Sequence, residues 1–162
     1  MQTSLVESRY LRLLLRWGSA SVLAGSFALF WAWGQETSWA KFTGVVAMHA
    51  IIWGGIDALL AWRGLKKHHA LAQLDDAHAQ QTHMAGVVAS LRFNEKLDWL
   101  YVAVGNALAI WALAAAGDAR ASLAGHAAGM LSQGGFLLLF DLAYLQALQR
   151  AQQHEPASSP AT

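Results

Sequence analysis

The feature that most constrains the fold of this chain is a set of four apolar stretches, each long enough to cross a lipid bilayer. They cover residues 13–33, 42–62, 97–116 and 123–145. A hydrocarbon layer of about 30 Å needs about 20 consecutive apolar residues in a helix. The composition agrees, since 56% of the residues are apolar and only 13% are charged. We therefore predict an all-α integral membrane protein, a four-transmembrane-helix antiparallel bundle that forms one domain over residues 1–150.

The basic residues predict an orientation in the membrane. Nine of the eleven Lys and Arg residues lie on one side of the predicted spans, and the other two are Lys41 and Arg120. Because Lys and Arg concentrate in cytoplasmic loops, we expect the N and C termini and the connection between the second and third spans to be cytoplasmic. The first span is not read as a signal peptide, because it ends in aromatic residues and not in a small-residue cleavage site.

Two segments outside the spans carry their own predictions. Residues 64–96 contain no Pro and only two Gly, and they are rich in Ala, Leu, Gln and His. We expect a long helical cytoplasmic extension here, which either lengthens the second and third spans or lies at the membrane surface as an amphipathic helix. Residues 151–162 are polar and contain both Pro residues of the chain. We expect this tail to be disordered.

Three aspartates interrupt the apolar stretches. Asp57, Asp98 and Asp141 each lie inside a predicted span or at its inner edge. A carboxylate near the centre of a bilayer costs about 2.5–3.5 kcal/mol on insertion scales, and such residues usually face the interior of a helix bundle. We expect all three in the inner half of the membrane, with Asp98 the shallowest because it opens the third span.

Other polar residues in the spans follow the same arrangement. Each helix with an aspartate carries a second polar group eight residues further out, at His49, Asn106 and Gln133, which a helix places about 12 Å away. The predicted polar cluster is Asp57, Asn94, Asp98, Tyr101, Gln133 and Asp141, with a second layer of His49, Asn106 and Tyr144. The alternative is structural, because polar side chains often hydrogen-bond across membrane helices and the glycines near them let backbones approach closely.

The histidines suggest a cofactor as a further hypothesis. His49 and His126 both fall in the outer half of their spans, where they could ligate a haem from two sides. Four more histidines lie in the cytoplasmic segment: His68, His69, His78 and His83. Their spacing does not favour a metal site, so we predict no bound metal there, and the absence of Cys leaves no thiolate ligand.

Three motifs carry a resemblance to a known family. They are the run from Trp53 to Asp57, the segment Asn94-x-x-x-Asp98-x-x-Tyr101-x-x-x-Gly105, and the run Gln133-Gly-Gly-Phe-Leu-Leu-Leu-Phe-Asp141. Together they resemble a family of small four-helix bacterial integral membrane proteins of unknown function. The resemblance covers about two-thirds of the chain and omits the first span. It implies a four-helix bundle in the bacterial cytoplasmic (inner) membrane and supplies no activity.

Three functions remain open from the sequence. In the first, the polar cluster binds a small polar group or a partner helix without chemistry. In the second, the protein is an oligomeric proton-coupled small transporter that uses Asp141 and Asp57. In the third, it is a haem- or quinone-binding electron-transfer protein that uses His49 and His126. We favour a non-enzymatic protein, because no nucleophile and base lie at usable spacing. We expect the lipid bilayer as a partner and no nucleic acid, with a homo-oligomer as an alternative to the single chain.

Overall fold

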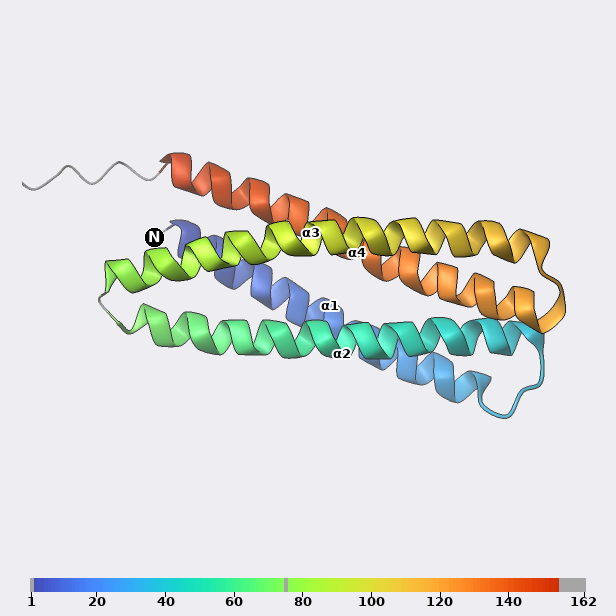
Figure 1. The fold of residues 1–162 in the computed structure, drawn as a ribbon. Helices are drawn as coiled ribbons and strands as arrows, with labels where there is room; N and C mark the ends of the chain where they lie inside the picture. The colour runs from blue at the N-terminus through green and yellow to red at the C-terminus, as the bar shows by residue number, and fades with distance from the viewer. Residues whose placement is uncertain (1, 75, 155–162) are drawn as a thin grey trace, which may run out of the picture.

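The protein folds into four long α-helices joined by short connections. In the computed structural model, which describes residues 2–74 and 76–154, the helices are α1 (Gln2–Ala32), α2 (Ser38–Ala72), α3 (Ala77–Ala114) and α4 (Gly117–His154). Figure 1 shows an elongated bundle in which the N-terminus, the turn between α2 and α3 and the far end of α4 lie at the same end. Over the described residues, the prediction of an all-helical, four-helix bundle is confirmed.

The helices are longer than the apolar stretches predicted for them. They contain 31, 35, 38 and 38 residues, and all four are long and apolar enough to cross a membrane. Much of the added length comes from residues 64–96, which extend α2 to Ala72 and begin α3 at Ala77. Of the two alternatives for this segment, the structure shows the direct extension of the second and third helices.

Side chains and a glycine define where helices start and stop. Thr37 caps α2 by accepting a hydrogen bond from the Ala40 amide at 3.1 Å. Asp76 caps α3 by accepting hydrogen bonds from the amides of His78 and Ala79, at 2.9 and 3.0 Å. Such caps satisfy amides that have no partner within the first turn. After α1, Gly34 adopts a φ of +76°, a backbone conformation that glycine adopts without steric cost and that often ends a helix.

Helices α1 and α2 pack backbone to backbone where glycines face each other. A Cβ atom placed on Gly54 would lie 2.7 Å from the Gly18 carbonyl oxygen, and one on Gly18 would lie 2.5 Å from the Gly54 carbonyl oxygen. Further along the pair, a Cβ on Gly25 would lie 2.8 Å from the carbonyl oxygen of Ala47. Small residues at these positions let membrane helices approach closely. The register of the α1–α2 pair therefore depends on the absence of these Cβ atoms.

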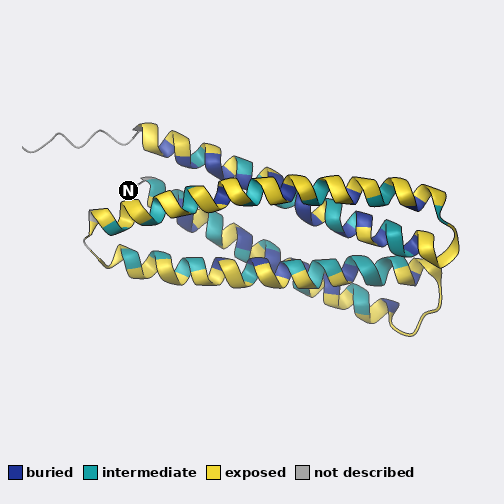
Figure 2. Ribbon diagram, in the orientation of Figure 1, coloured by how far each residue is buried: buried dark blue, intermediate teal, exposed yellow. Residues whose placement is uncertain are grey.

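Helix α4 is the common partner of the other three helices. The closest pairings are α1 with α2 and α3 with α4, and α4 also packs against both α2 and α1. One core cluster forms near the far end of α4, where Tyr144, Leu145 and Leu148 pack around Leu91 of α3. Figure 2 shows buried positions along the faces where helices meet and exposed positions on the outward faces.

The outward faces are strongly apolar. Phe30 and Leu113 are 80% and 78% exposed, and each of the four helices carries at least one other large apolar side chain that is more than half exposed. In water such a surface would be unfavourable, because the transfer of apolar area to water costs about 25 cal/mol per Å². The surface is compatible with contact to lipid.

The end of α4 differs from the sequence-based prediction. The prediction placed a disordered tail from Ala151, but α4 continues to His154 and Ala151 is buried. The reason is helical periodicity, since Ala151 follows Leu148 by three residues and falls on the same buried face. The rest of the predicted tail, residues 155–162, lies outside the described residues.

Candidate functional site

The three aspartates come together in the interior of the bundle. Asp57 of α2, Asp98 of α3 and Asp141 of α4 are 4%, 8% and 3% exposed. Asp98 and Asp141 interact electrostatically, and Asp57 interacts with both. Each carboxylate comes from a different helix, so the cluster exists only when α2, α3 and α4 are assembled.

Asp98 lies inside α3 and not at the start of that helix. A carboxylate in the first turn of a helix would be favoured by the helix dipole. In the structure α3 begins at Ala77 and Asp98 lies well inside it. The helix continues upstream because residues 77–96 contain no Pro. The dipole at the start of α3 therefore cannot stabilise Asp98, and its burial has to be compensated inside the cluster.

Asp141 has hydrogen-bond partners on two other helices. The Tyr10 hydroxyl of α1 donates to Asp141 Oδ1, and the Asn94 side chain of α3 also hydrogen-bonds Asp141. The Tyr10 ring stacks on Tyr144 and Phe140 of α4, with ring centroids 3.7 and 4.2 Å apart. The phenol is thus fixed in place, and α1 completes the cluster.

Three polar atoms of the cluster have no hydrogen-bond partner among the described residues. They are Oδ2 of Asp57, Oδ2 of Asp98 and the hydroxyl oxygen of Tyr144, and all three are fully buried. A buried polar atom without a partner costs about 1–3 kcal/mol, and more when the group is charged. Two carboxylates that are close together in an apolar environment are also unfavourable when both are charged. A hydrogen-bond donor bound in the cluster would relieve both costs.

A second polar chain lies further along the helices. Trp53 Nε1 of α2 donates to the hydroxyl of Tyr101 at 2.5 Å, and His49 Nδ1 lies 3.2 Å from the same oxygen. His49 Nε2 in turn lies 3.0 Å from Nδ1 of His126. Gly134 makes room for the Tyr101 ring, because a Cβ there would lie 2.9 Å from Tyr101 Cδ1.

This geometry does not favour the haem hypothesis. Two imidazoles on opposite sides of a metal ion would have their ligand nitrogens about 4 Å apart, from a metal–nitrogen distance of about 2 Å, with the porphyrin between them. The nitrogens of His49 and His126 are 3.0 Å apart and in direct hydrogen-bonding contact. His126 is also exposed at the bundle surface. In this structure the two rings contact each other, so their geometry gives the haem hypothesis no support.

The remaining predicted residues separate into buried and exposed ones. Gln133 is 4% exposed, and its Oε1 accepts a hydrogen bond from Trp17 Nε1 at 3.4 Å. Tyr144, predicted in the second layer, is 4% exposed because it stacks on Tyr10. Asn106, expected in the second layer, is exposed and donates to the Val102 carbonyl oxygen of its own helix at 2.9 Å. A turn of about 80° over eight residues was enough to move Asn106 off the inner face.

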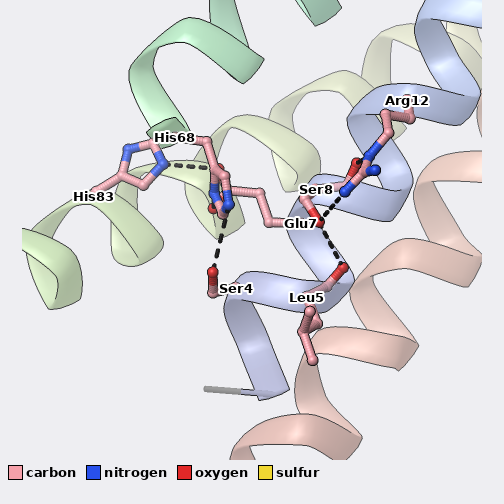
Figure 3. Close-up of polar contacts among 7 residues, drawn as sticks. All are labelled: Ser4, Leu5, Glu7, Ser8, Arg12, His68 and His83. Carbon is pink, nitrogen blue, oxygen red and sulfur yellow. Dashed lines mark hydrogen bonds and ion pairs between the residues drawn. The ribbon is translucent and has the colours of Figure 1, made fainter. Parts of the chain in front are cut away.

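A further buried acid was not singled out from the sequence. Glu7 of α1 is 4% exposed, and two histidines hold its carboxylate. His68 Nδ1 of α2 lies 2.9 Å from Glu7 Oε2, and His83 Nε2 of α3 lies 2.8 Å from Oε1. Figure 3 shows Glu7 between the two imidazoles, with Ser4 next to His68. Three helices therefore meet at one carboxylate near the N-terminal end of the bundle.

A sequence signal for the missed α1 residues does exist. The small residues Gly18, Ser21 and Gly25 repeat every three or four residues, and the same spacing continued upstream reaches positions 14, 10 and 7. This is the spacing of one face of a helix. It places Glu7 and Tyr10 on the face that later carries Gly18 and Gly25, although Glu7 and Tyr10 precede the predicted first span.

Comparison with known proteins gives a family and no activity. Residues 13–142 match a family of unknown function, DUF6992. The chain belongs to DUF6992. The predicted membership of an uncharacterised family is confirmed, and the match includes the first predicted span, which the sequence motifs had omitted. No curated protein and no solved structure matches this DUF6992 chain. Glu7 and Tyr10 precede the matched region.

No metal site is formed in the described part of this DUF6992 protein. Among residues 2–74 and 76–154, no group of three or more His, Asp or Glu side chains is placed so that it could hold a metal ion. The two imidazoles around Glu7 hydrogen-bond the carboxylate oxygens directly.

Proposed function

We propose that this protein is an integral protein of the bacterial cytoplasmic membrane, and that its carboxylate cluster binds a small hydrogen-bond-donating cation. Membrane insertion is supported by four helices of sufficient length and by the apolar outward faces. The basic residues support an orientation with both termini in the cytoplasm. In that orientation we expect the cluster to lie in the inner half of the bilayer.

The observation that carries the ligand proposal is the pair of buried, unpartnered oxygens. When the carboxylates are charged, Asp57 Oδ2 and Asp98 Oδ2 can accept hydrogen bonds but cannot donate them. A protonated amine provides both the donors and the positive charge that this site lacks. A partner helix is less suitable than a small cation, because Asp57, Asp98 and Asp141 are at most 8% exposed and a whole helix is too large to enter the interior of the bundle.

A thermal-stability assay tests this proposal. The protein, purified in mild detergent, is melted in methylammonium chloride and in tetramethylammonium chloride at equal ionic strength. Both ions carry one positive charge, but only methylammonium has N–H donors. A ligand at 100 times its Kd stabilises the folded state by about 2.7 kcal/mol. We expect methylammonium to raise the melting temperature and tetramethylammonium to leave it unchanged.

Two variants locate the effect. Asp98→Asn replaces one of the two oxygens that lack a partner, so the response to methylammonium should be lost. Asp118→Asn changes an exposed carboxylate at the other end of the bundle, so the response should be kept. Equal responses to both cations, or a full response in Asp98→Asn, would refute binding at the cluster.

Proton transport is the second candidate, and one observation favours it. Asp57 and Asp141 interact electrostatically in an apolar interior, and such a pair can share a proton. A transporter built this way would require an oligomer, because four helices leave little room for a pathway within one chain. Acidification of proteoliposomes, measured with an internal pH dye, tests it. Proton flux that is lost in Asp141→Asn would favour this function over simple binding.

A further inference from the structure

The outward face of α3 carries an amide in the middle of a predicted span. Asn106 is exposed and lies midway along residues 97–116. Its side-chain nitrogen donates one hydrogen bond to the Val102 carbonyl oxygen of the same helix. An asparagine side chain has two N–H donors and an acceptor oxygen, so one donor and the oxygen are left without a partner among the described residues. Hydrocarbon offers none, and such groups in membrane helices often hydrogen-bond to another helix.

The bundle covers the apolar part of α3 less than that of any other helix. Helix α3 pairs closely with α4, whereas α4 packs against three helices. The most apolar part of α3 has a smaller buried share than the corresponding parts of α1, α2 and α4. Figure 2 shows exposed positions along most of the length of α3. The outward face of this helix therefore has room for a further helix.

Asn106 is the central member of a regular row of exposed side chains on this face. The row is Trp99, Ala103, Asn106, Ile110 and Leu113, with steps of four, three, four and three residues. This alternation is the 3.5-residue repeat with which two helices pack side by side as a coiled coil. The small side chain of Ala103 lets the two backbones approach. A single Asn in such a row fixes the register and the number of helices.

The membrane itself favours a second copy of the chain as the partner. The bias of Lys and Arg gives every copy the same orientation, so the α3 helices of two copies run parallel. In a two-fold symmetric dimer, a residue near the axis meets the same residue of the other copy. Two Asn106 side chains then lie at the same depth, and each can donate an N–H to the oxygen of the other. A second copy therefore supplies the complementary group at the required depth.

Charged residues limit how far the contact extends. The row continues toward the start of α3 with Lys96 and Arg92, which are both exposed. In a parallel dimer these residues would face their own copies, and like charges repel. Long basic side chains can bend away into water at the membrane surface. The contact is therefore confined to the span, where the two helices cross near Asn106 and separate toward Lys96.

We propose that the protein forms a homodimer through the outward face of α3, with the two Asn106 side chains hydrogen-bonded to each other at the centre of the interface. The proposal rests on membrane insertion, as proposed above, and not on cation binding at the carboxylate cluster. Asp98 of that cluster is buried inside the bundle, whereas Asn106 faces outward from the same helix. Each copy therefore keeps its own cluster in the dimer.

Cysteine cross-linking tests the interface, because the chain contains no Cys of its own. Ala103→Cys and Ile110→Cys place thiols in the row, and Val104→Cys places one on a different exposed part of α3 at a similar depth. In proteoliposomes of low protein density oxidised with copper phenanthroline, we expect disulfide-linked dimers for the first two variants only. Equal cross-linking in all three would mean random collision and would overturn the proposal. No cross-linking in the first two would mean that lipid alone covers this face, which would also overturn it.

Two substitutions at Asn106 test the amide. Dimerisation is followed by energy transfer between N-terminally labelled copies as the ratio of protein to lipid is varied. Asn106→Leu should weaken it about tenfold, because two hydrogen bonds are lost and each contributes about a factor of three between membrane helices. Asn106→Gln keeps an amide and should weaken it less than threefold. An unchanged dimer in Asn106→Leu would overturn the proposal. Neither change should disturb the fold of one copy, because the side chain is exposed.

Two further measurements separate this proposal from the proposed function. Extraction of membranes with alkaline carbonate tests insertion, and release of the protein would refute insertion and the dimer together. A protein that is retained in the membrane but stays monomeric would overturn the dimer alone. A dimer in a protein whose melting temperature does not respond to methylammonium would support this proposal and refute binding at the cluster.

Discussion

Two adjacent glycines of α2 should respond in opposite ways to the same substitution. A Cβ atom on Gly54 would lie 2.7 Å from both the Gly18 carbonyl oxygen and the Ser21 Cβ, whereas a Cβ on Gly55 would meet nothing within 4 Å. Carbon atoms in contact prefer separations of about 3.5–4.0 Å, so Gly54→Ala forces α1 and α2 apart by roughly 1 Å. Gly55→Ala adds the same atom on a face that has room for it.

The magnitude follows from two terms. Replacing Gly by Ala in a helix interior stabilises it by about 0.8–1.0 kcal/mol at either position. Overpacking an interface costs about 1–3 kcal/mol, and this applies at Gly54 alone. The propensity term cancels in the comparison, so Gly54→Ala should be less stable than Gly55→Ala by about 1–3 kcal/mol. For a chain of this size that is a difference of roughly 2–12 °C in melting temperature.

The assay is thermal unfolding in mild detergent, followed by circular dichroism and repeated at several heating rates. Gly18→Ala should behave like Gly54→Ala, because a Cβ at Gly18 would lie 2.5 Å from the Gly54 carbonyl oxygen and 2.6 Å from the Ala58 amide nitrogen. If Gly54→Ala melts at or above the temperature of Gly55→Ala, the close contact between α1 and α2 does not exist as described.

Three further outcomes are expected. Asp141→Ala should lower the melting temperature more than Asp98→Ala does. The first variant leaves the buried Tyr10 hydroxyl without its acceptor, at a cost of about 1–3 kcal/mol, whereas the second removes an oxygen that has no described partner. Equal shifts in melting temperature would contradict this. Glu7→Gln should destabilise the protein by about 1.5–3 kcal/mol, since it weakens charge-assisted hydrogen bonds to two imidazoles, and chemical denaturation would measure it. The Lys41 ammonium lowers the pKa of Asp118, so this ion pair stabilises the fold fully above the pKa of Asp118 in the unfolded chain and ceases to do so as the pH falls through its pKa in the folded chain. Below the folded pKa, Asp118→Asn should therefore leave the melting temperature unchanged. A difference in melting temperature that persists there would contradict the ion pair.

The four helices could be predicted from the sequence because each is determined locally. Long apolar runs set the spans, and the lack of Pro in residues 64–96 allowed α2 and α3 to continue past them. The aspartates could also be predicted to cluster, since a charged group in an apolar helix has to face the bundle interior. These predictions needed no knowledge of how the helices pack.

The contacts that depend on packing were harder to predict. Glu7 meets His68 and His83 across separations of 61 and 76 residues, and the rotation and height of three helices decide whether they touch. Asn106 shows the same limitation in reverse, because its offset of eight residues from Asp98 allowed an inward position, but in the structure its side chain is exposed and bonds its own helix. Polarity identifies candidates, but only the packed helices show which of them meet.

The central position of α4 has a consequence for how the protein is made. Translation delivers α1 first and α4 last, yet α4 is the helix that packs against all the others. Until it arrives, Asp57 and Tyr10 have been synthesised without Asp141, and Tyr10 has not yet met the carboxylate to which it donates its hydrogen bond. A ribosome stalled before residue 117 should therefore leave an incompletely packed chain that membrane proteases degrade. Synthesis of the last helix should protect the chain from this degradation.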